Sequence, residues 1–174
     1  MKAELKEGDT ASIATTTSST VVTNTPTPTT VTDDFSGYIT YCDAVPWAGE
    51  IFMIRDRIHG RVITLTDGKL QLEPNVSGLG SWYWVCVEKD GWLGFRNYAS
   101  GAYIGHDGKG NFHAKVFHHK GHEFFCARRH PDGGYLLLMR HGNKLWKMDI
   151  KEGGNELVET ENKGTLWEFV KVQI

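Results

Sequence analysis

An all-β domain built from three repeats is the fold class that the sequence predicts, on three observations. Short apolar runs are separated by turn dipeptides such as Asp67-Gly68 and Asp90-Gly91. No longer window has the 3.6-residue apolar period of an amphipathic helix. Aromatic residues return at similar spacing, with Trp84, Phe125 and Phe169 separated by 41 and 44 residues. Strands, turns and a repeat therefore support the same fold class.

Twelve strand candidates follow one another along the chain, each rich in β-branched or aromatic side chains. They span residues 51–55, 61–65, 69–72, 82–87, 91–96, 102–105, 111–116, 123–127, 135–139, 144–148, 156–159 and 167–172. Residues 35–41 are expected to add a pairing segment before the first of them.

These twelve strands divide into three sets of four, with repeats at about residues 49–90, 91–133 and 134–174. A three-bladed propeller would have a channel too narrow to pack well, because propellers usually have four to eight blades. A β-trefoil fits better, since six strands close a barrel, six form capping hairpins, and closure removes exposed sheet edges. The residues expected to face inward are Ile51, Met53, Ile63, Trp84, Cys86, Phe95, Ile104, Phe112, Phe125, Leu137, Met139, Leu145 and Phe169.

Residues 1–34 differ in composition from the rest of the chain. Between Thr10 and Thr32 there are eleven Thr and three Ser but no aromatic residue. Such a segment buries too little apolar surface to offset its ordering entropy, so we expect it to be disordered. The folded domain is predicted to begin at Phe35 and to span residues 35–174.

Charge and cysteine content limit the possible partners and the compartment. A formal net charge of -2 gives no global attraction to nucleic acid or to an anionic membrane. No apolar run is long enough for a signal-peptide core or a membrane span. Cys42, Cys86 and Cys126 are an odd number without metal-ligand spacing, which suits a reducing compartment. We therefore expect a cytoplasmic protein with no membrane span, no specific nucleic-acid partner, no metal and no cofactor.

Four short motifs stand out in the middle repeat. They are Gly101-Ala102-Tyr103-Ile104, Asp107-Gly108-Lys109-Gly110, Phe125-Cys126-Ala127 and His130-Pro131-Asp132-Gly133. In this order they are similar to the "GkYL" strand, the "D-x-x-G" turn, the "F-x-V" strand and the "H-x-D-G" turn of the fascin-like β-trefoils. The match is good over the middle repeat, weaker over the other two and absent before Phe35.

This resemblance implies a non-enzymatic binding module whose partner is actin or another acidic protein surface. Fascins join several trefoils in one chain, whereas this chain has room for one, so bundling of filaments would require self-association. In size the chain is more similar to the hisactophilins, which are single-trefoil actin-binding proteins with far more histidine than the eight found here.

Two other groups of trefoils stay open as alternatives. Ricin-type sugar-binding trefoils have a Gln-x-Trp motif in each repeat, and the corresponding triplets here are Trp82-Tyr83-Trp84, Glu123-Phe124-Phe125 and Trp167-Glu168-Phe169. The absence of Gln from all three argues against a ricin-type lectin but not against carbohydrate binding in general. Trefoil protease inhibitors present variable loops without a transferable motif, so the sequence does not exclude them.

Basic and histidine residues gather in the middle repeat, where an acidic partner would bind. Seven of the eight histidines fall between His106 and His141. Histidine binds metals and titrates near neutrality, but no Cys or Asp stands at a spacing that completes a metal site. The candidate binding residues are Lys115, His118, His119, Lys120, His122, Arg128, Arg129 and His130.

Exposed aromatic residues would support sugar stacking instead. Trp47, Trp92, Tyr98 and Trp146 are not needed by the inward pattern, although packing against the core or the hairpins is favoured for each. No catalytic residues are predicted, because the sequence has neither a G-x-S-x-G elbow nor a phosphate-binding Gly-Lys-Ser/Thr loop. The segment 122–126 begins like a zinc-protease motif but lacks the second His. We therefore expect a binding module rather than an enzyme.

Overall fold

The computed structural model describes residues 40–74, 76 and 81–174. The predicted tail at residues 1–34 and the predicted domain start at Phe35 lie outside this part of the chain. No helix of the described residues has the length and apolar character needed to cross a membrane.

Thirteen strands and one short 3-10 helix make up the described domain. The strands are β1 (Thr40–Tyr41), β2 (Ile51–Asp56), β3 (Val62–Thr66), β4 (Lys69–Glu73), β5 (Trp84–Lys89), β6 (Trp92–Asn97), β7 (Tyr103–His106), β8 (Phe112–Val116), β9 (Phe125–Arg129), β10 (Tyr135–His141), β11 (Lys144–Ile150), β12 (Leu157–Thr160) and β13 (Trp167–Val172). The 3-10 helix η1 (Gly121–Glu123) leads into β9, and the sequence did not predict it. All twelve predicted strands are confirmed, and β1 is the end of the predicted first segment.

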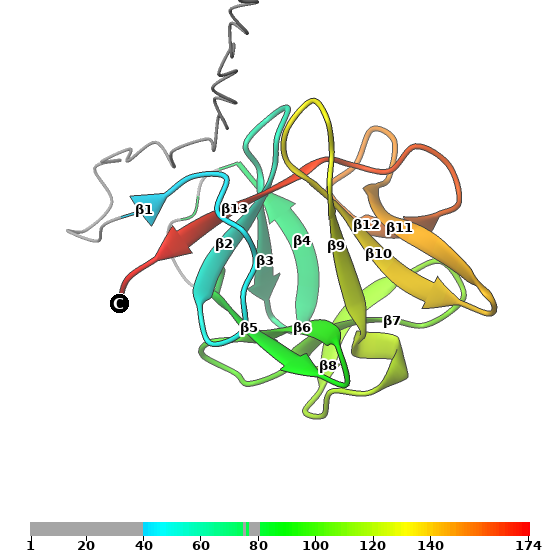
Figure 1. Ribbon diagram of the computed structural model, residues 1–174, viewed down its shortest axis with the longest axis horizontal. Coiled ribbons are helices and arrows are strands. Elements are labelled where there is room, and N and C mark those ends of the chain that lie inside the picture. The colour runs from blue at the N-terminus through cyan, green and yellow to red at the C-terminus, as the bar shows by residue number, and fades with distance from the viewer. Residues whose placement is uncertain (1–39, 75, 77–80) are drawn as a thin grey trace, which may run out of the picture.

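Six strands close a barrel by antiparallel pairing in the order β2, β5, β6, β9, β10, β13 and back to β2 (Figure 1). Strand β1 pairs with β13 on the outside of this ring, close to the C-terminus. Closure places each barrel strand between two neighbours, so the ring has no free outer edge strand.

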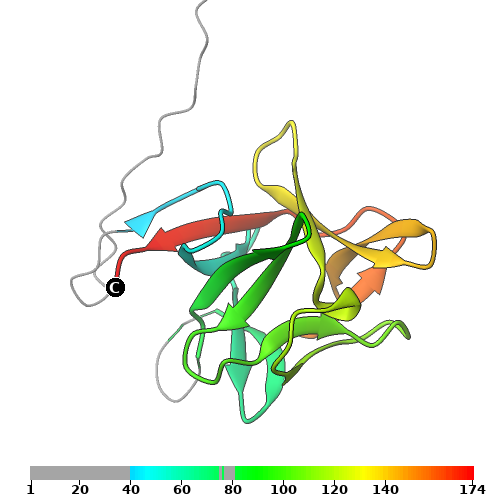
Figure 2. The same ribbon diagram turned by 60° about the horizontal axis from the view of Figure 1, so that its bottom comes forward.

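Three hairpins, β3–β4, β7–β8 and β11–β12, complete the units. Their second strands β4, β8 and β12 contact one another, and the backbone N–H of Leu72 donates to the carbonyl of Asn155 at 2.9 Å. Figure 2 shows these hairpins spread around the barrel. A barrel capped by three hairpins is the β-trefoil that the sequence predicts.

The pairing register corrects the predicted repeat spacing. The equivalent barrel pairs are Phe52 with Trp84, Leu93 with Phe125, and Tyr135 with Trp167. Barrel strands therefore repeat after 41 and then 42 residues, rather than after 41 and 44. The predicted separations of 41 and 44 residues do hold for Ile63, Ile104 and Met148, three fully buried residues of the hairpins. The reason is that eight residues, 139–146, lie between the paired residues Leu138 of β10 and Lys147 of β11. Only six lie between the corresponding pairs Arg55 and Val62, and Arg96 and Tyr103.

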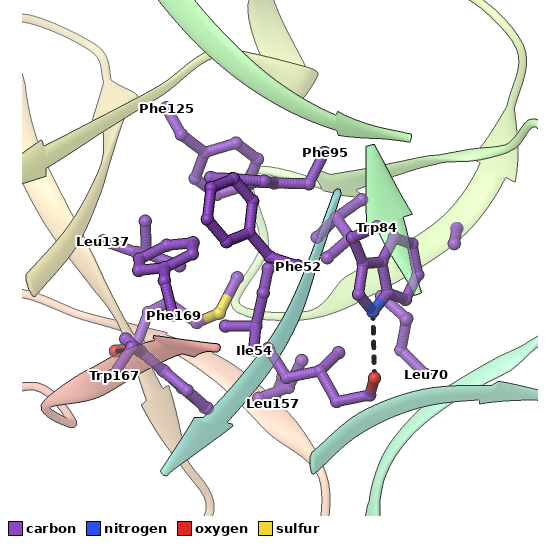
Figure 3. Packing of buried hydrophobic residues seen from close by; sticks show 14 of the residues in the cluster. Phe52, Ile54, Leu70, Trp84, Phe95, Phe125, Leu137, Leu157, Trp167 and Phe169 are labelled. Atoms are coloured by element: carbon purple, nitrogen blue, oxygen red, sulfur yellow. Dashed lines mark hydrogen bonds between the residues drawn. The ribbon is translucent and has the colours of Figure 1, made fainter. Parts of the chain in front are cut away.

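The core lies inside the barrel, where aromatic side chains from the three units meet (Figure 3). The ring of Phe169 contacts Phe52 and Phe95, each at a centroid distance of 5.5 Å. The indole N–H of Trp84 donates to the carbonyl of Ile63 at 2.9 Å, so this buried polar group is satisfied. Each such side chain stabilises the fold by roughly 1.5–3 kcal/mol on burial.

Two predictions about the core are wrong. Phe52 and Ile54 are fully buried, whereas Ile51 and Met53 are only half-buried, so the inward face of β2 is the opposite of the predicted one. Strand β2 is apolar on both faces, so its period of two does not distinguish the faces. Leu145 is 42% exposed, because it lies at the start of β11, where it pairs with Arg140 in the lengthened end of the β10–β11 hairpin.

Candidate ligand-binding surface on the middle unit

The predicted binding residues do not form one continuous surface. His118, Lys120 and His122 lie exposed near η1, before β9, and Lys115 is exposed on β8. Arg128, Arg129 and His130 lie at the other end of β9. The two ends of β9, Phe125 and Arg129, are about 13 Å apart at 3.3 Å per residue, so the strand keeps the two groups apart.

Two of the three residues at the far end of β9, Arg129 and His130, are occupied by contacts within the fold. Nη2 of Arg129 lies 2.6 Å from Oδ2 of Asp43, and its guanidinium lies 5.0 Å from the ring centroid of Tyr135. The ring nitrogen Nδ1 of His130 accepts the backbone N–H of Asp132 at 3.2 Å. Arg129 and His130 therefore hold the β1–β2 linker and the β9–β10 turn in place.

The outer face of β6 lies on the other side of the barrel wall from the core. Phe95 is fully buried and Leu93 packs against the core, so the alternation of the strand sends Trp92, Gly94 and Arg96 outward. Tyr103, the cross-strand partner of Arg96 on β7, faces the same way.

His119 lies directly over Gly94 on this face. Its Nε2–H donates to the carbonyl of Leu93 at 3.2 Å. A Cβ atom built at Gly94 would lie only 2.5 Å from Nε2 of His119, so only glycine leaves room for the ring. Burial lowers the pKa of His119, which keeps the ring neutral at pH 7.

Four rings follow one another across the outer face, and we call them the aromatic row. Trp92 stacks on Phe124 at a centroid distance of 5.9 Å and an angle of 3°. Phe124 meets His119 edge-on at 4.9 Å, and His119 stacks on Tyr103 at 5.5 Å. All four side chains are half-buried, so they pack on one another while part of each ring stays accessible.

Three cations surround the aromatic row. Lys89 is the cross-strand partner of Trp92, Arg96 that of Tyr103, and Lys120 follows His119 in the chain. All three are exposed, and among the described residues none of them forms an ion pair.

A buried polar cluster lies beside this surface, between the middle and third units. Both carboxylate oxygens of Glu159 accept a histidine Nδ1–H at 3.0 Å, one from His106 and the other from His141. Glu159 also accepts the backbone N–H of Gly108 at 3.1 Å. The ring of His122 lies 5.0 Å from that of His106, and within the described residues no three His, Cys, Asp or Glu side chains are placed to hold a metal. The cluster joins two hairpins and has no predicted ligand.

Of the four aromatic residues considered for sugar stacking, two are exposed and two are packed. Trp47 is 68% exposed on the β1–β2 linker, and Tyr98 is 52% exposed after β6. Trp146 stacks on His141 at 3.7 Å, and Trp92 belongs to the aromatic row.

Sequence reasoning missed Gly94, Tyr103, Phe124 and the flanking cations Lys89 and Arg96 as parts of this surface. The signal that could have found them is the alternation of β6. Once Phe95 is placed inside the barrel, Trp92, Gly94 and Arg96 have to face outward.

Comparisons with known proteins identify the fold. No family model and no curated protein sequence matches the chain. A ricin B-like lectin of Macrolepiota procera in complex with lactose is 16% identical, with a TM-score of 0.57 over 75% of this chain and 99% of that chain. The designed three-fold symmetric protein ThreeFoil is also 16% identical, with a TM-score of 0.58 over 71% and 99%. SeviL bound to the asialo-GM1 saccharide is 13% identical, with a TM-score of 0.54 over 69% and 94%.

The fold is a β-trefoil. At these identities the likeness shows the fold alone, and it does not show the expected relationship to the fascins or the hisactophilins. The strand register also changes which residues of the third repeat correspond to the Gln-x-Trp motif. Trp167 is the counterpart of Trp84 and Phe125, so the corresponding triplet is Thr165-Leu166-Trp167 rather than residues 167–169. Thr165, whose hydroxyl donates to Asp149 at 2.6 Å, stands where that motif has Gln.

Proposed function

We propose that this trefoil is a non-catalytic carbohydrate-binding module and that the aromatic row is its sugar-binding surface. The observation that supports this most directly is the row itself, with four half-buried rings on one outer face of the middle unit. Two proteins with the same fold, the Macrolepiota procera lectin and SeviL, are bound to sugars in their solved structures, which favours this class of ligand over a protein partner.

The chemistry of the row suits a sugar. The carbon-bound hydrogens on one face of a pyranose pack against aromatic faces, and the hydroxyl groups at its edge need polar partners. Arg96, Lys89 and Lys120 supply donors around the rings. Tyr103 adds a phenolic hydroxyl that both donates and accepts.

A glycan array followed by titration calorimetry tests the proposal. Trp92→Ala and Phe124→Ala should each weaken binding of the best glycan at least tenfold, because each removes a stacking ring. Trp47→Ala is the matched control, since Trp47 is an exposed tryptophan on the β1–β2 linker, and it should bind as the wild type does. An array without hits, or equal losses in all three variants, would contradict the proposal.

Binding of actin or another acidic protein surface is the second proposal, and the comparisons give it no support. The feature in its favour is the loop before β9, where His118, Lys120 and His122 are all exposed. Co-sedimentation with filamentous actin at low salt, at pH 6.5 and 7.5, should pellet the protein if this loop binds filaments. Absence from both pellets would exclude it.

We also propose a cytoplasmic location, which is favoured by an odd number of cysteines, three, without metal-ligand spacing in the sequence. Imaging of the tagged chain in its own cells checks this, and a secreted product would contradict it.

A further inference from the structure

We infer that the ligand of the aromatic row is an anionic oligosaccharide, one with a carboxylate or sulfate group, rather than a neutral sugar. This inference rests on the proposed carbohydrate-binding function and adds the charge of the ligand.

The cations occupy both ends and one side of the row. Lys89 lies beside Trp92 at one end, because these residues are cross-strand partners on the outer face of β5 and β6. Arg96 lies beside Tyr103 at the other end by the same kind of pairing. Lys120 follows His119 at the side.

Nearby carboxylates do not neutralise these three cations. Glu88 precedes Lys89 on β5, so its side chain points to the opposite face of that strand. Glu123 is buried, and its Oε2 accepts the backbone N–H of Lys120 at 3.2 Å rather than pairing with the ammonium group. Asp90 lies in the β5–β6 turn and forms no ion pair among the described residues. Counted against the three cations, its one negative charge still leaves an excess of two positive charges around the rings.

The row is also longer than a single ring contact. Successive centroids lie 5.9, 4.9 and 5.5 Å apart from Trp92 to Tyr103, so several sugar rings would contact it in sequence. An anionic group on an oligosaccharide that lies along the row would come close to Lys89 or Arg96. Each exposed cation near such a group is expected to improve affinity by about two- to fivefold.

Nucleic acid also combines negative charge with flat rings, and basic grooves with aromatic residues bind single strands. Here the rings stack on one another instead of standing apart as separate platforms, and the chain as a whole has a formal charge of -2. These two features favour the glycan.

The experiment compares lactose, 3′-sialyllactose, a sulfated heparin tetrasaccharide and a thymidine tetranucleotide by calorimetry, at 0.05 and 0.5 M salt. We expect at least one anionic glycan to bind at least fivefold more tightly than lactose at low salt. We expect this advantage to shrink at high salt, where charges are screened over about 4 Å. Lys89→Gln and Arg96→Gln combined should remove the advantage, whereas Lys69→Gln, an exposed lysine of β4, should leave it unchanged.

The outcomes distinguish a failure of the inference about ligand charge from a failure of the proposed carbohydrate binding. Equal binding of lactose and both anionic glycans, lost in Trp92→Ala, would overturn the inference about charge and leave carbohydrate binding standing. Binding of no glycan would overturn the proposed function itself. Tighter binding of the tetranucleotide than of any glycan would overturn both.

Discussion

Replacing Gly94 by alanine tests how the aromatic row is assembled. The new Cβ would lie 2.5 Å from Nε2, 2.7 Å from Cδ2 and 2.9 Å from Cε1 of His119, which are distances that real Cβ atoms do not tolerate. The ring of His119 is the end of a mobile side chain, so it should swing away from β6 rather than displace the strand. The row then loses its third ring.

The expected cost follows from the contacts that His119 gives up. Its hydrogen bond to the carbonyl of Leu93 stabilises the fold by about 1 kcal/mol, and its ring contacts with Tyr103 and Phe124 by about 0.5–1.5 kcal/mol each. Alanine is favoured over glycine within a strand by roughly 0.5–1 kcal/mol, which offsets part of this loss. The free energy of unfolding should therefore fall by about 1–3.5 kcal/mol.

Urea denaturation measures this change, and calorimetry with the best glycan measures the effect on binding, which should weaken at least tenfold. Gly121→Ala is the matched control, because Gly121 has no positive φ and a Cβ there meets nothing within 4 Å. Combining Gly94→Ala with His119→Ala should cost no more than His119→Ala alone, since the clash then has no partner. If Gly94→Ala unfolds at the wild-type urea concentration and binds glycan normally, the assembly described for the row is wrong.

Three further predictions concern the contacts around the row. Burial lowers the pKa of His106, so below the usual histidine pKa of 6.5 the unfolded chain binds more protons than the folded one. The free energy of unfolding should therefore fall as the pH is lowered from 7 to 5. His106→Gln should make this pH dependence weaker in urea titrations, and an unchanged pH dependence would contradict the prediction. Glu159→Gln should lower the free energy of unfolding by about 3 kcal/mol in thermal or urea melts, because the buried carboxylate accepts hydrogen bonds from His106, His141 and a backbone N–H. A loss below about 1 kcal/mol would show that these hydrogen bonds contribute little to stability. Arg129→Ala should cost less than about 1 kcal/mol and leave glycan affinity unchanged, since its pairing with Asp43 is partly exposed; weaker glycan binding would place Arg129 in the site.

The strands and the trefoil could be predicted because they depend on short apolar runs and turn residues, which can be recognised in the sequence itself. Turn dipeptides such as Asp90-Gly91 mark the ends of strands, and both of these residues have positive φ in the β5–β6 turn. The repeat spacing could be predicted only in part. Two extra residues between Leu138 of β10 and Lys147 of β11 offset β11 from the 42-residue step that β10 and β13 follow. An apolar pattern that continues through Leu145 does not show where these residues are inserted.

The candidate site was harder to predict, because neighbours in the sequence are not neighbours on a barrel. His118 and Arg129 belong to one basic stretch, yet β9 holds them at opposite ends. The aromatic row, in contrast, joins β6, β7 and the residues just before β9. Those contacts depend on strand register, which becomes known only once the barrel is closed.

His119 shows how the fold changes the interpretation that the sequence suggests for a residue. As one of several histidines in a row it reads from sequence as a solvated basic residue, and its neighbour His118 is indeed exposed. The missing side chain of Gly94 turns His119 inward onto β6, where burial keeps the ring neutral and places it between Tyr103 and Phe124. The positive charge of the surface therefore comes from Lys89, Arg96 and Lys120 at its rim, while its centre is apolar. A surface with an apolar centre and a basic rim suits a sugar chain with an acidic group better than it suits a flat acidic protein.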